Sequence, residues 1–494
     1  MAGATGGGSL KPAERAGTES GGFPRGRSTP RPVGTLFATR PHGSGMTGTD
    51  TRRAGFKRRT RVAEARERLL AATEPHGRTE RVRLVAADGR TLAADVAAER
   101  DVPGYERAAM DGFAVRAADT FGAAARSPAV LRVSGDDAGS GSDGAGEGPA
   151  SVGSGEAVRV HTGSEVPAGA DAVVMVESTE RVGDEVEVLE AVAEGENVGA
   201  PDEDVAAGRA LYEAGHRLRP SDLGLLKSVG VTRVPVAERP VVGVVPTGEE
   251  LVQGDPDPGE VVETNGLTVS TLVERWGGAA RYRDVVTDDA DALRAAIQRD
   301  LTADVVVTTG GSSVGERDLV PDVVADLGEL LVHGVALKPG HPAALGVVSG
   351  TPVLALPGYP VSCIVNAVQF LRPTLRRLAG AAEPTPEHPT VRARLERKVR
   401  SEPGTRTFAR VRLAPETATD DGGAAGGAAD GDADADGGVD ADDPAVPTAT
   451  PTRTSGAGIL SSVALADGWV VVPESVEGYP AGDVVDVQLW EWSA

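Results

Sequence analysis

The segment from Asp304 to Asp318, DVVVTTGGSSVGERD, combines a β-branched run, a glycine-rich loop and acidic side chains. The run of valines and threonines predicts a strand buried on both faces. Adjacent glycines permit a sharp turn and leave backbone N–H groups uncovered, and serines add hydroxyl donors. The loop residues in question are Gly310, Gly311, Ser312, Ser313 and Gly315.

A helix is expected from Leu319 to Leu327, directly after this loop. A strand, a glycine loop and a helix start together hold an anion on backbone N–H groups. Asp318 could then hold the Mg²⁺ that accompanies a phosphate. The loop is not a P-loop, because no Gly-Lys-Ser/Thr follows. The alternative is a plain tight turn between a strand and a helix.

Further charged residues follow other expected strands. Glu250 could be a carboxylate at a helix start, Asp288 an N-cap, and Lys338 a solvated loop charge. Together with Asp318, however, they place three carboxylates and one lysine beside a loop suited to an anion. Carboxylates repel a phosphate unless a cation intervenes, so the set predicts Mg²⁺ and a phosphate-bearing ligand.

The elements that would position these side chains alternate between strand and helix from Pro240 to about Gly380. Such alternation predicts a mainly parallel sheet with ligands at the carboxyl ends of its strands. Asn265 is expected to cap a helix that runs to Trp276. Besides the glycine-loop strand, the expected strands are Val241–Val245, Tyr282–Val286, Val332–Leu337 and Val353–Leu356, with a helix over Val361–Leu378.

Before this region, a helix is expected from Thr60, and Asp88-Gly89 predicts a hairpin turn. Residues 101–119 form a compact segment with Asp111 in apolar surroundings. Residues 134–155 are expected to be a surface loop. Strands are expected at Val158–His161 and Ala172–Val176.

After it, residues 388–413 and 456–492 predict a small β domain. Residues 414–453 between them are of low complexity, with nine Asp and no Lys or Arg from 420 to 443. This composition favours a disordered surface loop over a metal site. Residues 1–55 are also expected to be disordered, and Met46 is the preferred true start.

Composition excludes several classes of protein. A net charge of −23 over 494 residues argues against a general nucleic-acid binder and fits an acidic, salt-adapted proteome. The single cysteine, Cys363, excludes intramolecular disulfides and cysteine metal clusters. No apolar run approaches the roughly 18 residues of a membrane helix. Arg52-Arg53 is not followed by an apolar segment, so a cytoplasmic location is expected.

Taken together, the motifs resemble those of the molybdopterin molybdenumtransferases, the MoeA proteins and the gephyrin E-domain. The resemblance covers about residues 56–494, apart from the two low-complexity inserts at residues 134–155 and 414–453. The matching segments, in family order, are AAMDGFAVR, HTGSEVPAGADAVV, PTGEEL, TDDADALRAAI, TTGGSSVGERD, ALKPGHP, LPGYPVS and GAGILSS.

The resemblance implies insertion of molybdate into adenylylated molybdopterin, with Mg²⁺ and release of AMP. It implies a multidomain α/β plus β fold and a homodimer whose site is shared between chains, with pterin-supplying proteins as possible partners. The implied domains are an elongated linking domain (56–95 and 190–238), an inserted mixed domain with AMDG (96–189), a central α/β molybdopterin-binding domain with a mainly parallel sheet (239–382) and a C-terminal small β domain (388–494).

The resemblance also implies roles for individual residues. Those that would line the site are Asp111, Thr162, Glu250, Asp288, Asp318 and Lys338. Among them, Asp288, Asp318 and Glu250 would bind the metal ion. Phosphate or pterin would lie against Gly310, Gly311, Ser312, Ser313 and Gly315, and Pro357 and Pro360 would shape the wall.

Three positions depart from the family pattern. Tyr359 stands where Asn is frequent, His341 where a second Lys is frequent, and Gly266 where Arg is common. These departures concern the molybdate contacts and the choice between molybdate and tungstate. Two other functions are compatible with parts of the chain: adenylylation of the pterin itself, and a non-catalytic molybdopterin-binding scaffold.

Overall fold

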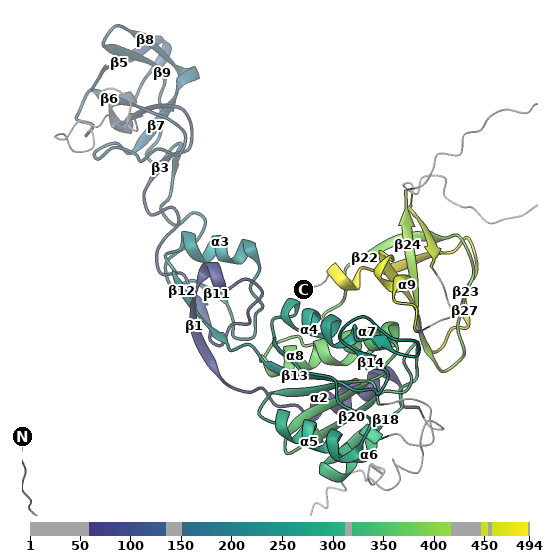
Figure 1. The fold of residues 1–494 in the computed structure, drawn as a ribbon. Coiled ribbons are helices and arrows are strands. Elements are labelled where there is room, and N and C mark those ends of the chain that lie inside the picture. The colour runs from purple at the N-terminus through teal and green to yellow at the C-terminus, as the bar shows by residue number, and fades with distance from the viewer. Residues whose placement is uncertain (1–58, 135–150, 312–318, 416–445, 453–456, 493–494) are drawn as a thin grey trace, which may run out of the picture. The chain divides into compact units, whose positions relative to one another are not determined.

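A computed structural model describes residues 59–134, 151–311, 319–415, 446–452 and 457–492 (Figure 1). The described residues form several sheets, each with its own apolar core. No helix in these ranges has the length and apolar character that a membrane crossing requires.

The central sheet has six strands in the order β16-β13-β17-β21-β20-β18. The first four run parallel, and β20 is antiparallel to both of its neighbours. The mainly parallel sheet predicted from the sequence is therefore confirmed. The strand bounds are β13 Val241–Pro246, β16 Ala279–Tyr282, β17 Val305–Thr309, β18 Glu329–His333, β20 Ala344–Val348 and β21 Thr351–Leu356.

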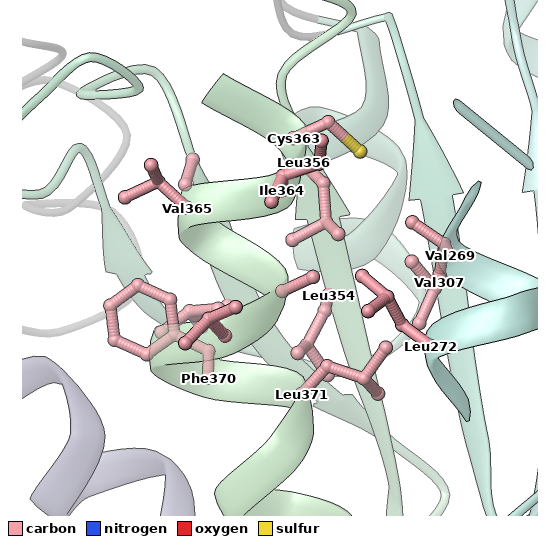
Figure 2. Packing of buried hydrophobic residues seen from close by; sticks show 14 of the residues in the cluster. Val269, Leu272, Val307, Leu354, Leu356, Cys363, Ile364, Val365, Phe370 and Leu371 are labelled. Atoms are coloured by element: carbon pink, nitrogen blue, oxygen red, sulfur yellow. The ribbon is translucent and has the colours of Figure 1, made fainter. Parts of the chain in front are cut away.

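Helices cover both faces of this sheet (Figure 1). One apolar core lies against α4, α7 and α2, and a second lies against α5 and α6. In the first, the side chains of Leu354 and Val307 lie near Leu272 of helix α4 and Leu371 of the helical segment η5 (Figure 2). The helix bounds are α2 Val62–Ala71, α4 Asn265–Arg275, α5 Ala290–Asp300, α6 Leu319–Leu327, α7 Pro360–Asn366 and α8 Arg372–Leu378, with the π-helical turn η5 Ala367–Leu371 joining the last two.

Two expected strands of this sheet were wrong in their bounds. The strand expected at Tyr282–Val286 ends at Tyr282, and Val286 makes only an isolated bridge to Thr247. The run expected at Val332–Leu337 is divided, because β18 ends at His333 and Leu337 begins β19 (Leu337–Lys338), which pairs with β24 of a different sheet. Gly334, which has a φ of 86°, lies at the break and was the available signal for this change of partner.

A smaller layer pairs β1 (Thr79–Arg83) with β12 (Arg233–Ala237) and packs α3 (Pro220–Ser228) against it. The hairpin predicted at Asp88-Gly89 was wrong, because β1 pairs with this distant strand and not with the next segment. Short elements complete the layer: η2 Leu84–Ala86, β2 Val96–Ala97 and β11 Ala210–Tyr212. The β3–β10 pair of Arg107–Ala108 with Val198–Gly199 packs against the inserted sheet instead.

The inserted sheet has the order β7-β4-β6-β5-β9-β8 and mixes parallel with antiparallel pairs. Its core is formed by inward-facing residues such as Phe113, Val174 and Val188. The bounds are β4 Gly112–Val115, β5 Ala124–Val133, β6 Glu156–Val160, β7 Ala172–Met175, β8 Thr179–Val182 and β9 Glu185–Glu190, with η3 Ala117–Thr120 and η4 Val176–Ser178.

The C-terminal sheet closes on itself, because β24 pairs with both β25 and β26. Its core is rich in valine and alanine. The bounds are β22 Thr390–Leu395, β24 Arg406–Ala414, β25 Thr448–Pro451, β26 Gly468–Val472 and β28 Val484–Gln488. Short elements nearby are β23 Val399–Arg400, β27 Gly478–Tyr479, α9 Ser461–Ala464 and η6 Trp490–Trp492.

The expectation that residues 414–453 form one disordered insert was wrong in its bounds. Strand β25 falls inside this range and joins β24 to β22. Its sequence, Thr-Ala-Thr-Pro, is short and follows a low-complexity segment, so the composition of the whole stretch concealed it. Residues 416–445 lie outside the described residues.

Ala414 and Thr448 are register partners in adjacent antiparallel strands, so a short connection can join them. We expect a Gly/Ser linker in place of residues 416–445 to leave the melting temperature nearly unchanged, since halving a loop alters closure by only about 0.6 kcal/mol. Replacement of 414–453 also deletes β25 and should destabilise the chain by several kcal/mol, about the loss of one packed strand. Denaturant unfolding of both variants measures the difference, and equal stability would contradict the role of β25 in closing the sheet.

Candidate functional site

The glycine loop begins where β13, β17 and β21 end side by side. Gly310 has a φ of 121° and donates its N–H to the Leu356 carbonyl at 3.0 Å. A Cβ atom at this position would lie 2.1 Å from the Thr247 carbonyl oxygen. Glycine is therefore required here by both the backbone angle and the space.

The Pro357–Pro360 turn lies against this loop. A Cβ atom on Gly358 would be 3.4 Å from the Gly310 Cα. The Asn265 side-chain amide donates to the Gly358 carbonyl at 2.6 Å and holds the turn in place. The prediction that Asn265 is an N-cap was wrong: Thr264 occupies that position, and Asn265 is the first helical residue of α4.

Asp288 lies beside the same loop, half-buried, and its Oδ1 atom has no hydrogen-bond partner among the described residues. A Cβ atom on Gly311 would be 3.7 Å from that oxygen. Burial raises the pKa of the Asp288 carboxyl, and the negative charges of Glu250 and Glu249 raise it further. The interpretation of Asp288 as an N-cap was wrong, because Asp289 caps α5 through the N–H groups of Asp291 and Ala292.

Thr247 is a residue that sequence reasoning missed. It ends the β13 segment, is 2% exposed, and its Oγ1 atom also lacks a partner among the described residues. A Cβ atom on Gly311 would be 2.9 Å from this hydroxyl. Two oxygens that lack a partner among the described residues therefore face one small region, where a ligand could complete their bonding. The available sequence signal was its place between Pro246 and Gly248, just after the valine-rich strand.

The donor set in this region suits a hard cation. Mg²⁺ prefers oxygen ligands and is commonly held by one or two carboxylates together with substrate phosphates. Asp288 and the exposed Glu250 supply two carboxylates on neighbouring loops. No three His, Cys, Asp or Glu side chains converge within the described ranges. Asp318, Ser312, Ser313 and Gly315 lie outside the described residues.

Lys338 borders a separate cavity of about 480 Å³ between the Pro357–Pro360 turn and the C-terminal sheet. Its Nζ atom lies 3.0 Å from Glu402 Oε1. Tyr359, His341, Arg400 and Arg410 also line the cavity. Sequence reasoning missed the two arginines. Arg410 is 3% exposed, and an arginine among the inward positions of β24 was the available signal.

The glycine at position 266 has a structural counterpart in Tyr282. A Cβ atom on Gly266 would meet the Tyr282 ring at 2.5 Å, so the tyrosine occupies the space a longer side chain would need. The Tyr282 hydroxyl donates to Glu263, which in turn accepts the Gly266 N–H at 2.6 Å. This arrangement fixes the start of α4, which carries Asn265.

Asp111 and Thr162 form a pair in the inserted domain. Asp111 Oδ1 accepts the Thr162 N–H at 2.7 Å and its hydroxyl at 2.8 Å. These two hydrogen bonds lower the pKa of the Asp111 carboxyl, so it remains ionised. The expectation of apolar surroundings was wrong, because the side chain is 52% exposed. In the described part of the chain, the hydrogen bonds of this pair stay within the inserted domain.

A mainly parallel sheet with a glycine loop at the carboxyl ends of its strands is the arrangement in which α/β domains commonly bind ligands. Comparison with known proteins assigns it further. Residues 60–230 match the model "MoeA N-terminal region (domain I and II)", 243–377 match "Probable molybdopterin binding domain", and 438–490 match "MoeA C-terminal region (domain IV)".

Individual relatives agree with these matches. A protein of Methanocaldococcus jannaschii named for molybdopterin biosynthesis is 32% identical over 86% of this chain and 95% of its own length. The molybdopterin molybdenumtransferase of Bacillus subtilis is 35% identical over 50% of this chain, a match that spans 58% of that enzyme. A crystal structure of a MoeA protein from Pyrococcus horikoshii covers 87% of this chain and 100% of its own, at 30% identity and a TM-score of 0.69. The chain belongs to the MoeA family.

The raised pKa of Asp288 gives a test of its environment. The folded chain holds this proton more tightly than the unfolded chain, so the stabilisation from the neutral carboxyl is present below the unfolded pKa. It is lost as pH rises through the folded pKa. At pH 7 the ionised carboxylate is therefore a net cost, and we expect Asp288→Asn to raise the melting temperature slightly.

The measurement is thermal unfolding from pH 3.5 to 8 in the absence of divalent ions. Asp284→Asn removes the same charge from an exposed neighbouring position and should stay within about 0.5 kcal/mol of the parent. A lower melting temperature for Asp288→Asn at pH 7 would show that the carboxylate has a structural partner instead.

Proposed function

We propose that this protein inserts molybdate into adenylylated molybdopterin, with Mg²⁺ as the metal ion and AMP as a product. Its family acts in molybdenum cofactor biosynthesis, and several relatives are named molybdopterin molybdenumtransferases. The observation that carries the proposal is the half-buried Asp288 carboxylate, whose Oδ1 faces a glycine loop and has no partner in the described part of the chain. An enzyme that binds phosphate through a metal needs this combination.

In this proposal the phosphate groups of the pterin substrate lie on the backbone N–H groups of the glycine loop. Asp288 and Glu250, together with Asp318, would hold Mg²⁺, which neutralises the phosphoanhydride and polarises it for cleavage. The Thr247 hydroxyl would donate to the same ligand. The Pro357–Pro360 turn, held by Asn265, forms the adjoining wall and orients the substrate.

Molybdate is a small dianion and would bind in the cavity that contains Lys338, Arg400 and Arg410. Charge-assisted hydrogen bonds from these groups favour an oxyanion. Glu402 Oε1 lies 3.0 Å from Lys338 Nζ and positions the lysine side chain at this cavity. Tyr359 lies at the edge between this cavity and the pterin wall, so it is placed to affect which oxyanion is accepted.

A second enzymatic function would be adenylylation of the pterin itself. The matches to N-terminal and C-terminal MoeA regions favour the molybdenumtransferase. A non-catalytic scaffold has no use for an unsatisfied carboxylate at the loop.

The absence of internal disulfides in a chain with one cysteine supports a reducing, cytoplasmic setting.

Purified chain, adenylylated molybdopterin and Mg²⁺ should release AMP only when molybdate is added. We expect Asp288→Asn to lower this rate by roughly 10²–10³, the scale of one preorganised electrostatic contact. Lys338→Gln should raise the molybdate concentration needed for half-maximal release, whereas Lys398→Gln, an exposed lysine outside the cavity, should not. Consumption of ATP without molybdate dependence would identify an adenylyltransferase, and no turnover of either kind a scaffold.

We further propose that the active enzyme is a homodimer in which Asp111 and Thr162 of one chain complete the site of the other. The pair is exposed, hydrogen-bonded only within its own domain among the described residues, and held ionised. The carboxylate is about half exposed, so it is accessible to a second chain while it holds Thr162. A two-fold dimer would bring it to a site that one chain leaves incomplete.

Mixing two inactive variants tests this arrangement. Asp111→Asn and Asp288→Asn should each abolish most molybdate-dependent AMP release. If the site is shared, mixed dimers contain one wholly native site, and random mixing should recover about a quarter of the activity. Light scattering gives the oligomeric state in parallel. Sites confined to single chains predict no recovery at all.

A further inference from the structure

A second and larger cavity, of about 780 Å³, lies between helices α2 and α8 and the C-terminal sheet. Its lining contains four arginines, one histidine and two carboxylates. The basic residues are Arg66, Arg372, His388, Arg392 and Arg406, and the acidic residues are Glu387 and Asp486. In a chain with a net charge of −23, such a concentration of arginine is unexpected for a structural boundary.

The arginines approach the cavity from different elements. Arg66 on α2 is half-buried, donates through Nη2 to Gln369 Oε1 at 3.1 Å, and has no acceptor for its Nε among the described residues. Arg372 at the start of α8 is 4% exposed. Arg406 lies at the start of β24, with its Nη2 atom 3.0 Å from Glu474 Oε2. Arg392 belongs to β22.

The positive charges affect one another. Burial and the charge of Arg406 lower the pKa of Arg66. Burial and the charges of Arg372, Arg66 and Arg376 lower the pKa of His388 to about 4. Four arginines lie against the two lining carboxylates and Glu474, the partner of Arg406, so one positive charge is left over, which an anion would neutralise.

We propose that this cavity binds a small phosphate-bearing anion. Its volume is within the range of small-molecule sites. Guanidinium groups on separate elements can bind phosphate oxygens through paired hydrogen bonds. Apolar side chains such as Phe408 and Val471 form another part of the wall and would contact a non-phosphate portion of the ligand. The site lacks the carboxylate pair of the glycine loop, so it needs no metal ion.

Pyrophosphate is a suitable probe, titrated by calorimetry in buffer with EDTA. The glycine-loop site should not hold it there, because its carboxylates repel phosphate without Mg²⁺. We expect one pyrophosphate to bind per chain, and Arg66→Gln and Arg392→Gln each to weaken binding about tenfold or more. Both side chains are partly exposed, so the variants should fold, as thermal unfolding will verify.

Matched controls remove the same charge nearby. Arg68→Gln lies on α2 and Arg394→Gln on β22, and neither side chain lines the cavity. Binding that persists within about twofold in these controls supports the site, and equal weakening in all four variants would reduce it to non-specific attraction. Absence of binding in EDTA would overturn the proposal and leave the Mg²⁺-dependent chemistry at the glycine loop untouched.

Discussion

The contact between Gly310 and the Thr247 carbonyl is the constraint on which the arrangement of the central site depends. It lets the loops after β13 and β17 approach without a side chain between them. Leu356 at the end of β21 accepts the Gly310 N–H, so three strand ends are tied at one point. Any Cβ at this position would push the Thr247 oxygen away and separate the loop from Asp288. Main-chain packing, and not side-chain contacts, therefore sets where the glycine loop begins.

The surroundings of that loop are not optimised for stability. Asp288 has an unsatisfied oxygen and lies near two further negative charges, and the Thr247 hydroxyl is buried without a partner among the described residues. Both features cost free energy. A serine in place of Asp288 or a valine in place of Thr247 would avoid that cost. The apolar clusters on the two faces of the sheet are extensive enough to tolerate this cost. Departures from local stability of this kind are typical of sites that must bind a ligand.

The sequence was most informative where the signal was local. The β-branched run of β17, the glycines after it and the helix α6 could be predicted because propensity and burial agree there. Partners distant in the chain could not. Strand β1 pairs with β12, and Leu337–Lys338 joins the C-terminal sheet, although nothing in their composition indicates a partner. Asn265 was predicted to be an N-cap because a helix begins beside it. Its side chain instead donates a hydrogen bond to Gly358, in a turn that is distant in the sequence.

Strand β24 shows how one element can serve two cavities. Arg406, Phe408 and Arg410 alternate along it, so all three project from the same face. Arg406 lines the larger cavity, Arg410 the one with Lys338, and Phe408 borders both. Phe408 packs edge-on against Trp469, with 5.3 Å between the ring centroids, and Trp469 stacks on Trp490, with 4.8 Å between theirs. This aromatic group is continuous with the core of the α/β domain, so it keeps two cationic regions apart and gives each a separate ligand environment.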